Sequence, residues 1–333
     1  MEEENSMKLR TIIILIISLT LSKASLAQCC SAGNPFFYGE QATIKGNELQ
    51  VLLGYKYSIS DTYYSKSDRV AIDFVDKAYF NYLNLQFIYG LSQRISLEAD
   101  LGYFLNKTED YKDAGWQTSN GYGLGDATVK VRYLAYNNFK RKLSITPSLG
   151  IKLPIGVFDQ ETTDHVKLPI TVQPSSGSYK YQANIYINKT SKNALWNFGF
   201  YGSFEYAQLI NSKNFYYQYG NMYLFSILGS YKIGQTIYVG LELRNENRSK
   251  SKRENNQVVE SSGYQIIYTI PHVSINTKKN LKFSFDAEIP TYRYYNGIQL
   301  GNKMAISARV SYPIDFQKRR SGAVNKKHKA IKC

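Results

Sequence analysis

The chain has 333 residues, a net charge of +15 and 14% aromatic residues, with 30 tyrosines against 2 tryptophans. No apolar run reaches the roughly 18 residues that a membrane-spanning helix needs, and the mean hydropathy of −0.37 is compatible with alternating strands whose polar and apolar residues average out. Seven Lys and Arg residues and no acid follow Phe316, which leaves +8 scattered over the rest of the chain. The charge therefore does not indicate nucleic-acid binding.

Residues 1–27 have the pattern of a secretory signal peptide. A basic start and a short apolar run at 11–21 precede Ser25 and Ala27, which are small residues at the two positions that signal peptidase reads. We expect cleavage after Ala27. The alternatives are a membrane anchor that stays in place and a lipoprotein acylated on Cys29.

The mature chain would begin with an irregular lead-in at residues 28–47, placed in the periplasm or inside a lumen. It contains Cys29 and Cys30, and the remaining cysteine is Cys333. No His or Cys lies nearby at metal-ligand spacing, so a zinc site is not expected. In an oxidising envelope the adjacent thiols can pair with another chain or with Cys333.

Strict alternation of apolar and polar residues is clearest between residues 121 and 159. In the first of two runs, Ala127, Val129 and Val131 fall on one side of a strand and their polar neighbours on the other. A short basic connection leads into the second run. Runs of this length exceed the roughly five or six residues of soluble strands, whereas a tilted strand needs about 9–11 residues to cross a bilayer. The length therefore indicates membrane-spanning strands.

The same alternation recurs in twelve runs along the chain. They occupy residues 48–60, 79–91, 95–107, 123–137, 142–155, 178–190, 195–209, 221–233, 236–248, 263–276, 281–294 and 303–316. Short connections at 92–94, 138–141, 191–194, 234–235 and 277–280 alternate with longer ones at 61–78, 108–122, 156–177, 210–220, 249–262 and 295–302. This sorting is typical of an even-stranded outer-membrane barrel with both ends in the periplasm. We therefore predict an all-β fold: a transmembrane antiparallel up-and-down β-barrel of about 12 strands over residues 48–316.

One face of the predicted strands is apolar and the other carries charge. We expect the apolar face, with aromatic residues near the strand ends, to contact lipid. The opposite face would line the lumen with Lys56, Glu98, Asp100, Asp126, Lys130, Arg132, Lys152, Lys180, Glu205, Glu242, Arg244, Lys282, Asp286, Glu288 and Arg309. These side chains form either a conduit whose charges set selectivity or an ion-pair network that fills the interior. Both remain open, because twelve strands lie between filled and water-filled barrels.

Short motifs in the middle third of the chain resemble those of a known family. A Gly-Leu-Gly-Asp sequence opens one strand, the next strand ends in Leu-Pro-Ile-Gly, and a Pro-Ser-Ser-Gly-Ser segment follows. The motif residues are Gly123, Gly125, Asp126, Pro154 and Gly156. The pattern resembles the outer-membrane family described as "MetA-pathway of phenol degradation" or simply as transporters. The resemblance implies passage or binding of small, often apolar or aromatic compounds, and no enzymatic activity.

The end of the predicted barrel departs from the usual pattern. Barrels of this kind usually end at an aromatic residue, and Phe316 is the candidate signal for the barrel-assembly machinery. Residues 317–333 follow it, and we interpret them as a basic, disordered tail in the periplasm.

One pair of residues permits an enzymatic alternative. His272 and Ser274 lie two apart on one strand face, a spacing similar to that of outer-membrane phospholipase A. In that enzyme Asn-Gly follows the serine, whereas Ile275 follows it here, and the predicted periplasmic position is far from the outer leaflet. Carboxylate pairs such as Glu98 and Asp100 are interpreted as lumen charge. We therefore predict no catalytic residue, no cofactor and no metal site.

The sequence thus predicts a cell outer-membrane channel or transporter for passive passage of small solutes, including apolar or aromatic ones. A structural or surface-interaction barrel with a filled lumen is the alternative, and an outer-membrane hydrolase is the least favoured. The expected partners are outer-membrane lipid, the barrel-assembly machinery and a small-molecule solute, without nucleic acid.

Overall fold

The computed structural model describes residues 44–72, 74–111, 118–162, 164–212, 215–278 and 280–316. The expected signal peptide, Cys29 and Cys30, most of the lead-in and the tail 317–333 lie outside these residues. The strands are β1 (Glu48–Lys66), β2 (Asp68–Val70), β3 (Lys77–Gly90), β4 (Ile95–Asp110), β5 (Ser119–Tyr133), β6 (Tyr136–Asn138), β7 (Leu143–Leu153), β8 (Lys180–Thr190), β9 (Trp196–Ala207), β10 (Ile210–Ser212), β11 (Phe215–Gln218), β12 (Met222–Ile233), β13 (Ile237–Arg248), β14 (Lys252–Arg253), β15 (Tyr264–Asn276) and β16 (Lys282–Asp315), with a 3₁₀ turn, η1 (Glu254–Asn256).

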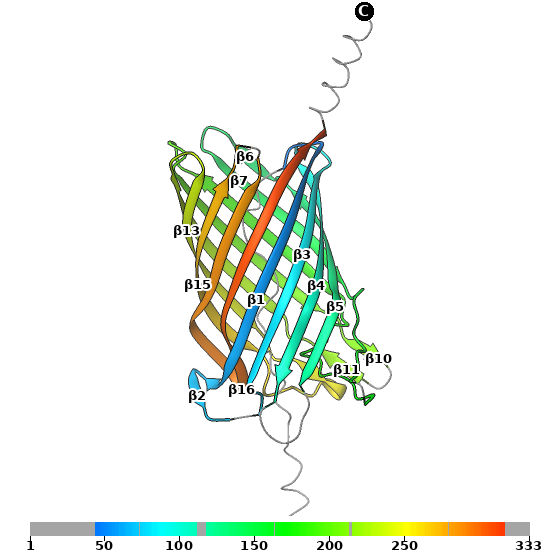
Figure 1. The fold of residues 1–333 in the computed structure, drawn as a ribbon. Helices are drawn as coiled ribbons and strands as arrows, with labels where there is room; N and C mark the ends of the chain where they lie inside the picture. The colour runs from blue at the N-terminus through cyan, green and yellow to red at the C-terminus, as the bar shows by residue number, and fades with distance from the viewer. Residues whose placement is uncertain are drawn as a thin grey trace, which may run out of the picture.

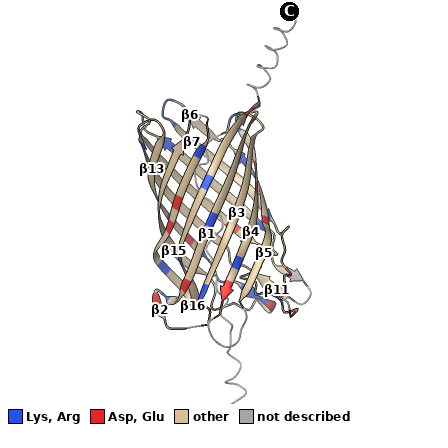
Figure 2. Cartoon of the chain, viewed as in Figure 1, with Lys and Arg blue, Asp and Glu red and all other residues tan. Residues whose placement is uncertain are grey.

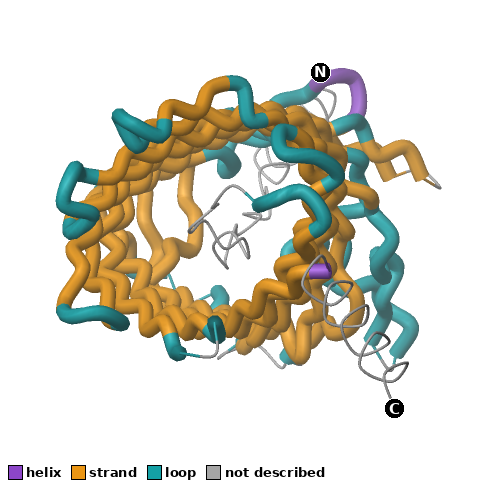
Figure 3. The backbone as a smooth tube through the Cα atoms, turned by 90° about the horizontal axis from the view of Figure 1, so that it is seen from above, coloured by secondary structure: helices purple, strands orange, loops and turns teal. Residues whose placement is uncertain are grey.

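The long strands form one closed antiparallel sheet. Each pairs with its neighbour in sequence, from β1 through β3, β4, β5, β7, β8, β9, β12, β13 and β15 to β16. β16 then pairs with β1, so the sheet has no free edge between its first and last strands. Figure 1 shows the tilted wall, and Figure 3 shows the closed ring seen along its axis. The predicted up-and-down barrel is confirmed.

β16 folds back on itself and fills two places in the wall. Its first half pairs with β15 and its second half with β1. Asp286 and Arg309, which an extended strand would place about 75 Å apart, are joined by an ion pair of 2.7 Å. The reversal occurs at Asn296 and Gly297, and Gly297 has a φ of +61°. Residues 295–302 were predicted to be a long connection, and that prediction is wrong, because Asn-Gly forms a tight hairpin turn there.

The wall is uneven in height, because several strands continue past their predicted ends toward the long connections. β1 has 19 residues and β4 has 16, whereas β7 and β8 have 11 each. Over the shorter side, β10, β11 and β14 form a separate three-stranded sheet. These three strands lie in the connections 210–220 and 249–262, which were predicted only to be long, so both of these loops carry strand structure of their own.

The two ends of the barrel-forming chain meet at the short-turn end. Asn47, just before β1, donates its backbone N–H to the carbonyl of Gly90 at 2.8 Å. Phe316, just after β16, donates to the carbonyl of Asn47 at 3.2 Å. The Phe316 ring also lies edge-on to Tyr89, with centroids 6.4 Å apart. This position agrees with the predicted even number of crossings, while the assembly role of Phe316 stays a prediction.

The outer surface of the barrel is apolar. Leucine, isoleucine, valine and aromatic side chains are exposed along the strands, among them Leu53, Leu101, Val131, Ile227 and Leu241. Exposed aromatic rings gather near both ends of the wall, such as Trp196 with Tyr231 at the short-turn end and Phe204 with Tyr223 toward the long loops. An apolar band flanked by aromatic residues is the lipid-facing surface of a transmembrane barrel. No helix in the described ranges is long and apolar enough to cross a bilayer.

A charge placed on this band should destabilise the barrel. Leu241, in the middle of β13, is 49% exposed on the outer face. We expect Leu241→Arg to lower the free energy of unfolding by about 2–4 kcal/mol, because the cation would lie near the bilayer midplane. Urea unfolding in lipid vesicles measures this change. Val166→Arg is the control, since Val166 is equally apolar and 62% exposed but lies in a loop. An equal effect of both substitutions would contradict a lipid-facing wall.

Candidate functional site

The inner face of the barrel carries the charges that the sequence predicts. Lys56 is fully buried, although the preceding Tyr55 is 37% exposed on the outer face. Charged residues occur along the strands and not only in the loops (Figure 2). The predicted lumen residues that are buried are Lys56, Glu98, Asp100, Lys130, Arg132, Lys152, Lys180, Glu205, Glu242, Arg244 and Glu288. Those that are partly buried are Asp126, Lys282, Asp286 and Arg309.

Glu288 is the centre of a first ion-pair network. Lys56 on β1 donates to both of its carboxylate oxygens, at 2.8 and 2.9 Å. Arg244 on β13 donates to the same carboxylate at 3.1 Å and, through Nε, to Glu242 at 2.9 Å. Ser226 on β12 donates its hydroxyl to Glu242 at 2.7 Å. The network therefore runs around the inner face of the barrel and links β1, β16, β13 and β12.

A second network surrounds Glu98 on β4. Lys130 on β5 donates to it at 2.8 Å, and the Arg132 guanidinium lies 3.7 Å away. Gln86 on β3 donates to Glu98 at 3.0 Å and to Asp100 at 3.3 Å. The sequence predicted that lumen charges of opposite sign can pair across strands, and these contacts show such pairs between β4 and β5, with the neutral Gln86 of β3 bonded to both carboxylates.

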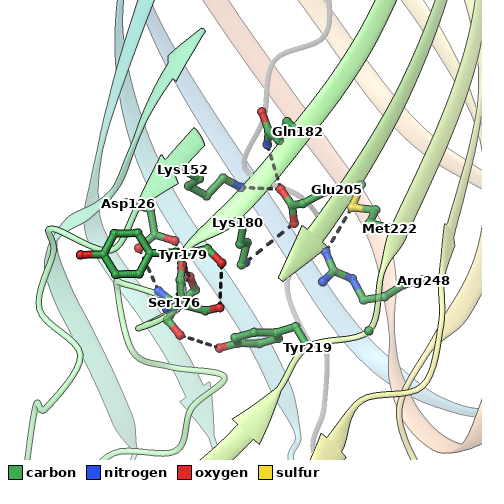
Figure 4. Close-up of polar contacts among 12 residues, drawn as sticks. Asp126, Lys152, Ser176, Tyr179, Lys180, Gln182, Glu205, Tyr219, Met222 and Arg248 are labelled. Atoms are coloured by element: carbon green, nitrogen blue, oxygen red, sulfur yellow. Dashed lines mark hydrogen bonds and ion pairs between the residues drawn. The ribbon is translucent and has the colours of Figure 1, made fainter. Parts of the chain in front are cut away.

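A third network is built on Glu205 of β9 (Figure 4). Lys152 on β7 and Gln182 on β8 donate to Oε2 at 3.1 and 2.8 Å. Lys180 lies 3.9 Å from Oε1, and its ammonium group sits over the ring of Tyr219, 4.6 Å from the centroid. One carboxylate thus holds two buried lysines beside the root of a long loop.

Several of these contacts reach past one strand, and the intervening side chains explain why. Lys56 and Glu288 lie on either side of the second half of β16, whose inward residues there are Ala305 and Ser307. Small side chains leave room for the lysine to pass over them. These networks consequently join strands that are next to each other or one apart along the wall.

The motif residues of the middle third come together in space. Asp126 accepts hydrogen bonds from Ser175 Oγ at 2.6 Å, from the Ser176 backbone at 3.0 Å and from Ser176 Oγ at 2.5 Å. Tyr219 in turn donates its hydroxyl to the carbonyl of Ser176 at 3.2 Å (Figure 4). The Gly-Leu-Gly-Asp strand therefore anchors the end of the long connection between β7 and β8.

Glycines permit the close approach of these motif segments. Gly156, two residues beyond Pro154, packs against the carbonyls of Leu124 and Gly125, and a Cβ at Gly156 would lie 2.0 Å from the first and 2.6 Å from the second. Gly123 has a φ of +120°, which residues with a side chain rarely adopt. The motif glycines thus allow the backbone of β5 to contact the backbone of the segment that follows β7.

The long-loop half of the interior contains clusters of aromatic and apolar side chains. Phe80, Tyr82 and Phe104 form one cluster on β3 and β4, with the Tyr82 and Phe104 ring centroids 4.7 Å apart. Other clusters lie around Tyr268 of β15 and Leu224 of β12. The Glu205 network lies on the same side, so the long-loop half combines aromatic clusters with buried charge.

The sequence reasoning missed two interior charges on β13. Glu246 on β13 is 1% exposed and lies 3.7 Å from Arg244. Arg248, two residues further on, donates to the sulfur of Met222 at 3.1 Å (Figure 4). Glu242, Arg244, Glu246 and Arg248 occupy every second position of β13 and therefore share its inner face. Extending the predicted alternation to the end of β13 identifies the last two as interior residues.

The His272 and Ser274 pair does not have the geometry of a nucleophile and its base. Ser274 Oγ and His272 Nε2 are both buried, and neither has a hydrogen-bond partner within the described part of the chain. The two atoms therefore do not bond each other. The pair lies near the short-turn end of β15, as predicted.

No protein-family model matches the chain, and no curated protein matches it. Solved structures of outer-membrane barrels are similar to it. A COG4313 outer membrane channel from Pseudomonas putida F1 has a TM-score of 0.68 at 14% identity, over 84% of this chain and 100% of that one. The NanC porin gives 0.42 at 11% identity, over 79% and 97%, and the beta domain of the Bordetella autotransporter BrkA gives 0.45 at 11%, over 81% and 100%. At these identities the likeness extends to the fold.

The closed wall, its apolar exterior and this fold place the protein in the outer membrane as a β-barrel. Barrels of this kind direct their short turns to the periplasm and their longer loops to the outside.

Removing the carboxylate of Glu205 should destabilise the barrel strongly. Glu205→Gln leaves the buried cations of Lys152 and Lys180 without their shared counter-charge, so we expect a loss of about 3–5 kcal/mol in urea unfolding. Glu260→Gln is the control, because the pair of Glu260 with Lys250 is on the surface and should contribute about 0–1 kcal/mol. Similar losses in both variants would argue against a buried network.

Asp126→Asn should loosen the connection between β7 and β8, because hydrogen bonds to a charged acceptor are lost. We expect trypsin to cleave after Lys167 roughly tenfold faster in the folded variant, since each such bond contributes about 1.5–3 kcal/mol. Glu161→Gln removes an exposed carboxylate from the same connection and should leave the rate unchanged. A wild-type cleavage rate in Asp126→Asn would show that the anchor has no role.

Proposed function

We propose that the protein is a passive channel for small solutes, including solutes with an apolar or aromatic body. The proposal rests on how the interior is lined. Charged groups are held in networks between nearby strands, and the apolar rings of the long-loop half lie against the wall. The fold similarity to a protein described as an outer membrane channel supports it.

One observation carries the proposal: interior rings lie over glycines. A Cβ on Gly102 would be 1.7 Å from Tyr82 Oη and 2.3 Å from its Cζ, so the Tyr82 ring covers the place where a side chain would stand. A Cβ on Gly301 would be 2.6 Å from the ring of Tyr64. A ring that lies on the backbone projects less toward the barrel axis. This packing supports a conduit with an aromatic lining.

The networks support the same function from the charged side. Each of three carboxylates, those of Glu98, Glu205 and Glu288, pairs with cations on the adjacent strand or on the next strand beyond it. Pairing between nearby strands holds long lysine and arginine side chains against the wall. Residual fields from such rings of mixed charge are what sets ion preference in channels.

The alternative is a barrel with a filled lumen that works through its loops. The observation favouring it is the density of the buried networks, since Lys56, Glu98 and Arg244 are all 2% exposed or less. A hydrolase is less favoured, because Ser274 Oγ and His272 Nε2 do not bond each other.

The packing of Tyr82 on Gly102 provides the test. In Gly102→Ala the new methyl group must displace the Tyr82 ring toward the axis, so we expect lower single-channel conductance in planar bilayers. Stability should fall by about 1–3 kcal/mol, the usual cost of overpacking. Adding Tyr82→Ala to Gly102→Ala should restore the conductance to at least the wild-type value.

Gly199→Ala is the matched control. Gly199 is also on the inner face, but a Cβ there would meet Tyr186 Oη at an ordinary 3.4 Å, so conductance should not change. All variants are measured with and without residues 29–46, which lie mostly outside the described residues and were predicted to lie either in the periplasm or inside the lumen. If no solute flux appears in either form, the channel is excluded and the filled barrel is favoured.

A further inference from the structure

The short-turn end of the inner face contains a polar recess on β15 and β16 that the networks described above do not use. His272, Ser274 and Asn276 follow one another on the inner face of β15. Their register partners on β16 are Asp286, Ser284 and Lys282. On the other side, Gly240 of β13 is the register partner of His272. We call these six residues of β15 and β16, together with Arg309, the short-turn recess.

Buried polar atoms in this recess lack partners within the described part of the chain. His272 is 8% exposed and its Nε2 accepts or donates no hydrogen bond. Ser274 is 1% exposed and its Oγ is also unpaired, and so is Asn276 Oδ1 on the same face. A buried polar group without a partner is costly, and such groups are rare in native proteins unless they serve a ligand or water. Three such atoms within five residues make the recess a candidate binding site.

The position of the His272 ring is fixed by the wall. A Cβ on Gly240 would lie 2.4 Å from His272 Cε1 and 2.9 Å from its Nδ1. The imidazole therefore lies on the backbone of β13, and a larger residue than glycine would push it away. The glycine thus holds the ring in the recess, next to Ser274.

The charge around the recess selects the sign of the ligand. Asp286 is occupied, because Arg309 donates to it at 2.7 Å and Ser307 at 3.2 Å. Asp286 is the register partner of His272, and Lys282 lies on the same inward face of β16, four residues before Asp286. Two cations therefore face one carboxylate that is already bonded.

Charged groups on the adjacent strands do not change this excess of positive charge around Asp286. Glu242 on β13 is bonded to Arg244 and Ser226. Lys56 on β1 is bonded to Glu288, which lies two residues from Asp286 on the same face of β16. Lys232 on β12 lies over the ring of Tyr238 on β13, 5.8 Å from its centroid, and adds a further cation at this end. The surroundings of the recess favour an anion.

We propose that the short-turn recess binds the carboxylate of a small organic acid, with Lys282 supplying the charge and Ser274 and His272 the hydrogen bonds. The site rests on the proposed function only for its role, which is to receive the acid group of a solute whose apolar body has passed the aromatic half. Binding itself requires no conduction.

The test is calorimetric titration of the purified full-length protein in detergent with benzoate and with benzyl alcohol, which has the same ring but no charge. We expect benzoate to bind at least tenfold more tightly than benzyl alcohol. Ser274→Ala and Lys282→Gln should each weaken benzoate binding roughly tenfold, as expected on loss of one hydrogen bond to a charged group. Ser144→Ala on β7 is the control and should leave binding unchanged.

Folding of each variant is checked by its heat-dependent shift on a gel, and only folded variants are compared. Equal binding of the two probes, or unchanged benzoate binding in both recess variants, would overturn the site. Inorganic phosphate that binds more tightly than benzoate through the same residues would overturn its assignment to carboxylates. If the barrel binds benzoate but conducts no solute, the binding site is supported and the channel proposal is overturned. If it conducts solutes but does not bind benzoate, the channel is supported and the binding site is overturned.

Discussion

The whole structure depends on the pairing between β1 and β16. In lipid each unpaired backbone group costs several kcal/mol, so a spanning sheet must have no open edge. The register from Glu48 opposite Asp315 to Lys66 opposite Tyr295 closes the ring along the full length of β1. Closure also places apolar residues outward and most of the strands' charged residues inward, although the inner face of β3 carries none. The polar interior follows from this arrangement, which is the reverse of the apolar core of a soluble protein.

Because the apolar residues face lipid, the interior is held by polar contacts and by rings packed on the backbone. Three carboxylates, Glu98, Glu205 and Glu288, organise buried cations from nearby strands. Removing one partner of such a pair is costly, whereas the pair itself gives little net stability. The networks therefore shape the lumen more than they stabilise the fold. The Tyr82 ring packs on the backbone of Gly102, where the absence of a side chain leaves room for it.

The inner face changes character along the axis, and the two proposals follow this order. The aromatic clusters and the Glu205 network lie toward the long loops, the Glu288 network lies nearer the middle, and the recess of His272 and Ser274 lies at the short-turn end. A solute with an apolar body and an acid group would meet matching surroundings in that sequence. The loop segment held by Asp126 stands at the entrance to this path, beside Lys180 and Glu205 (Figure 4).

The sequence alone determined the long strands, their inward and outward faces and most of the interior charges, because a strand alternates its side chains with a period of two wherever one side meets lipid. It also contained the Asn296-Gly297 turn, whose hairpin signal was overlooked in favour of a long loop. Only the tertiary structure decided which charges pair, that Asp126 binds Ser175 and Ser176, and that Gly240 supports His272. Those contacts join residues distant in sequence, and they depend on how closure and strand register bring the strands together, which local periodicity does not encode.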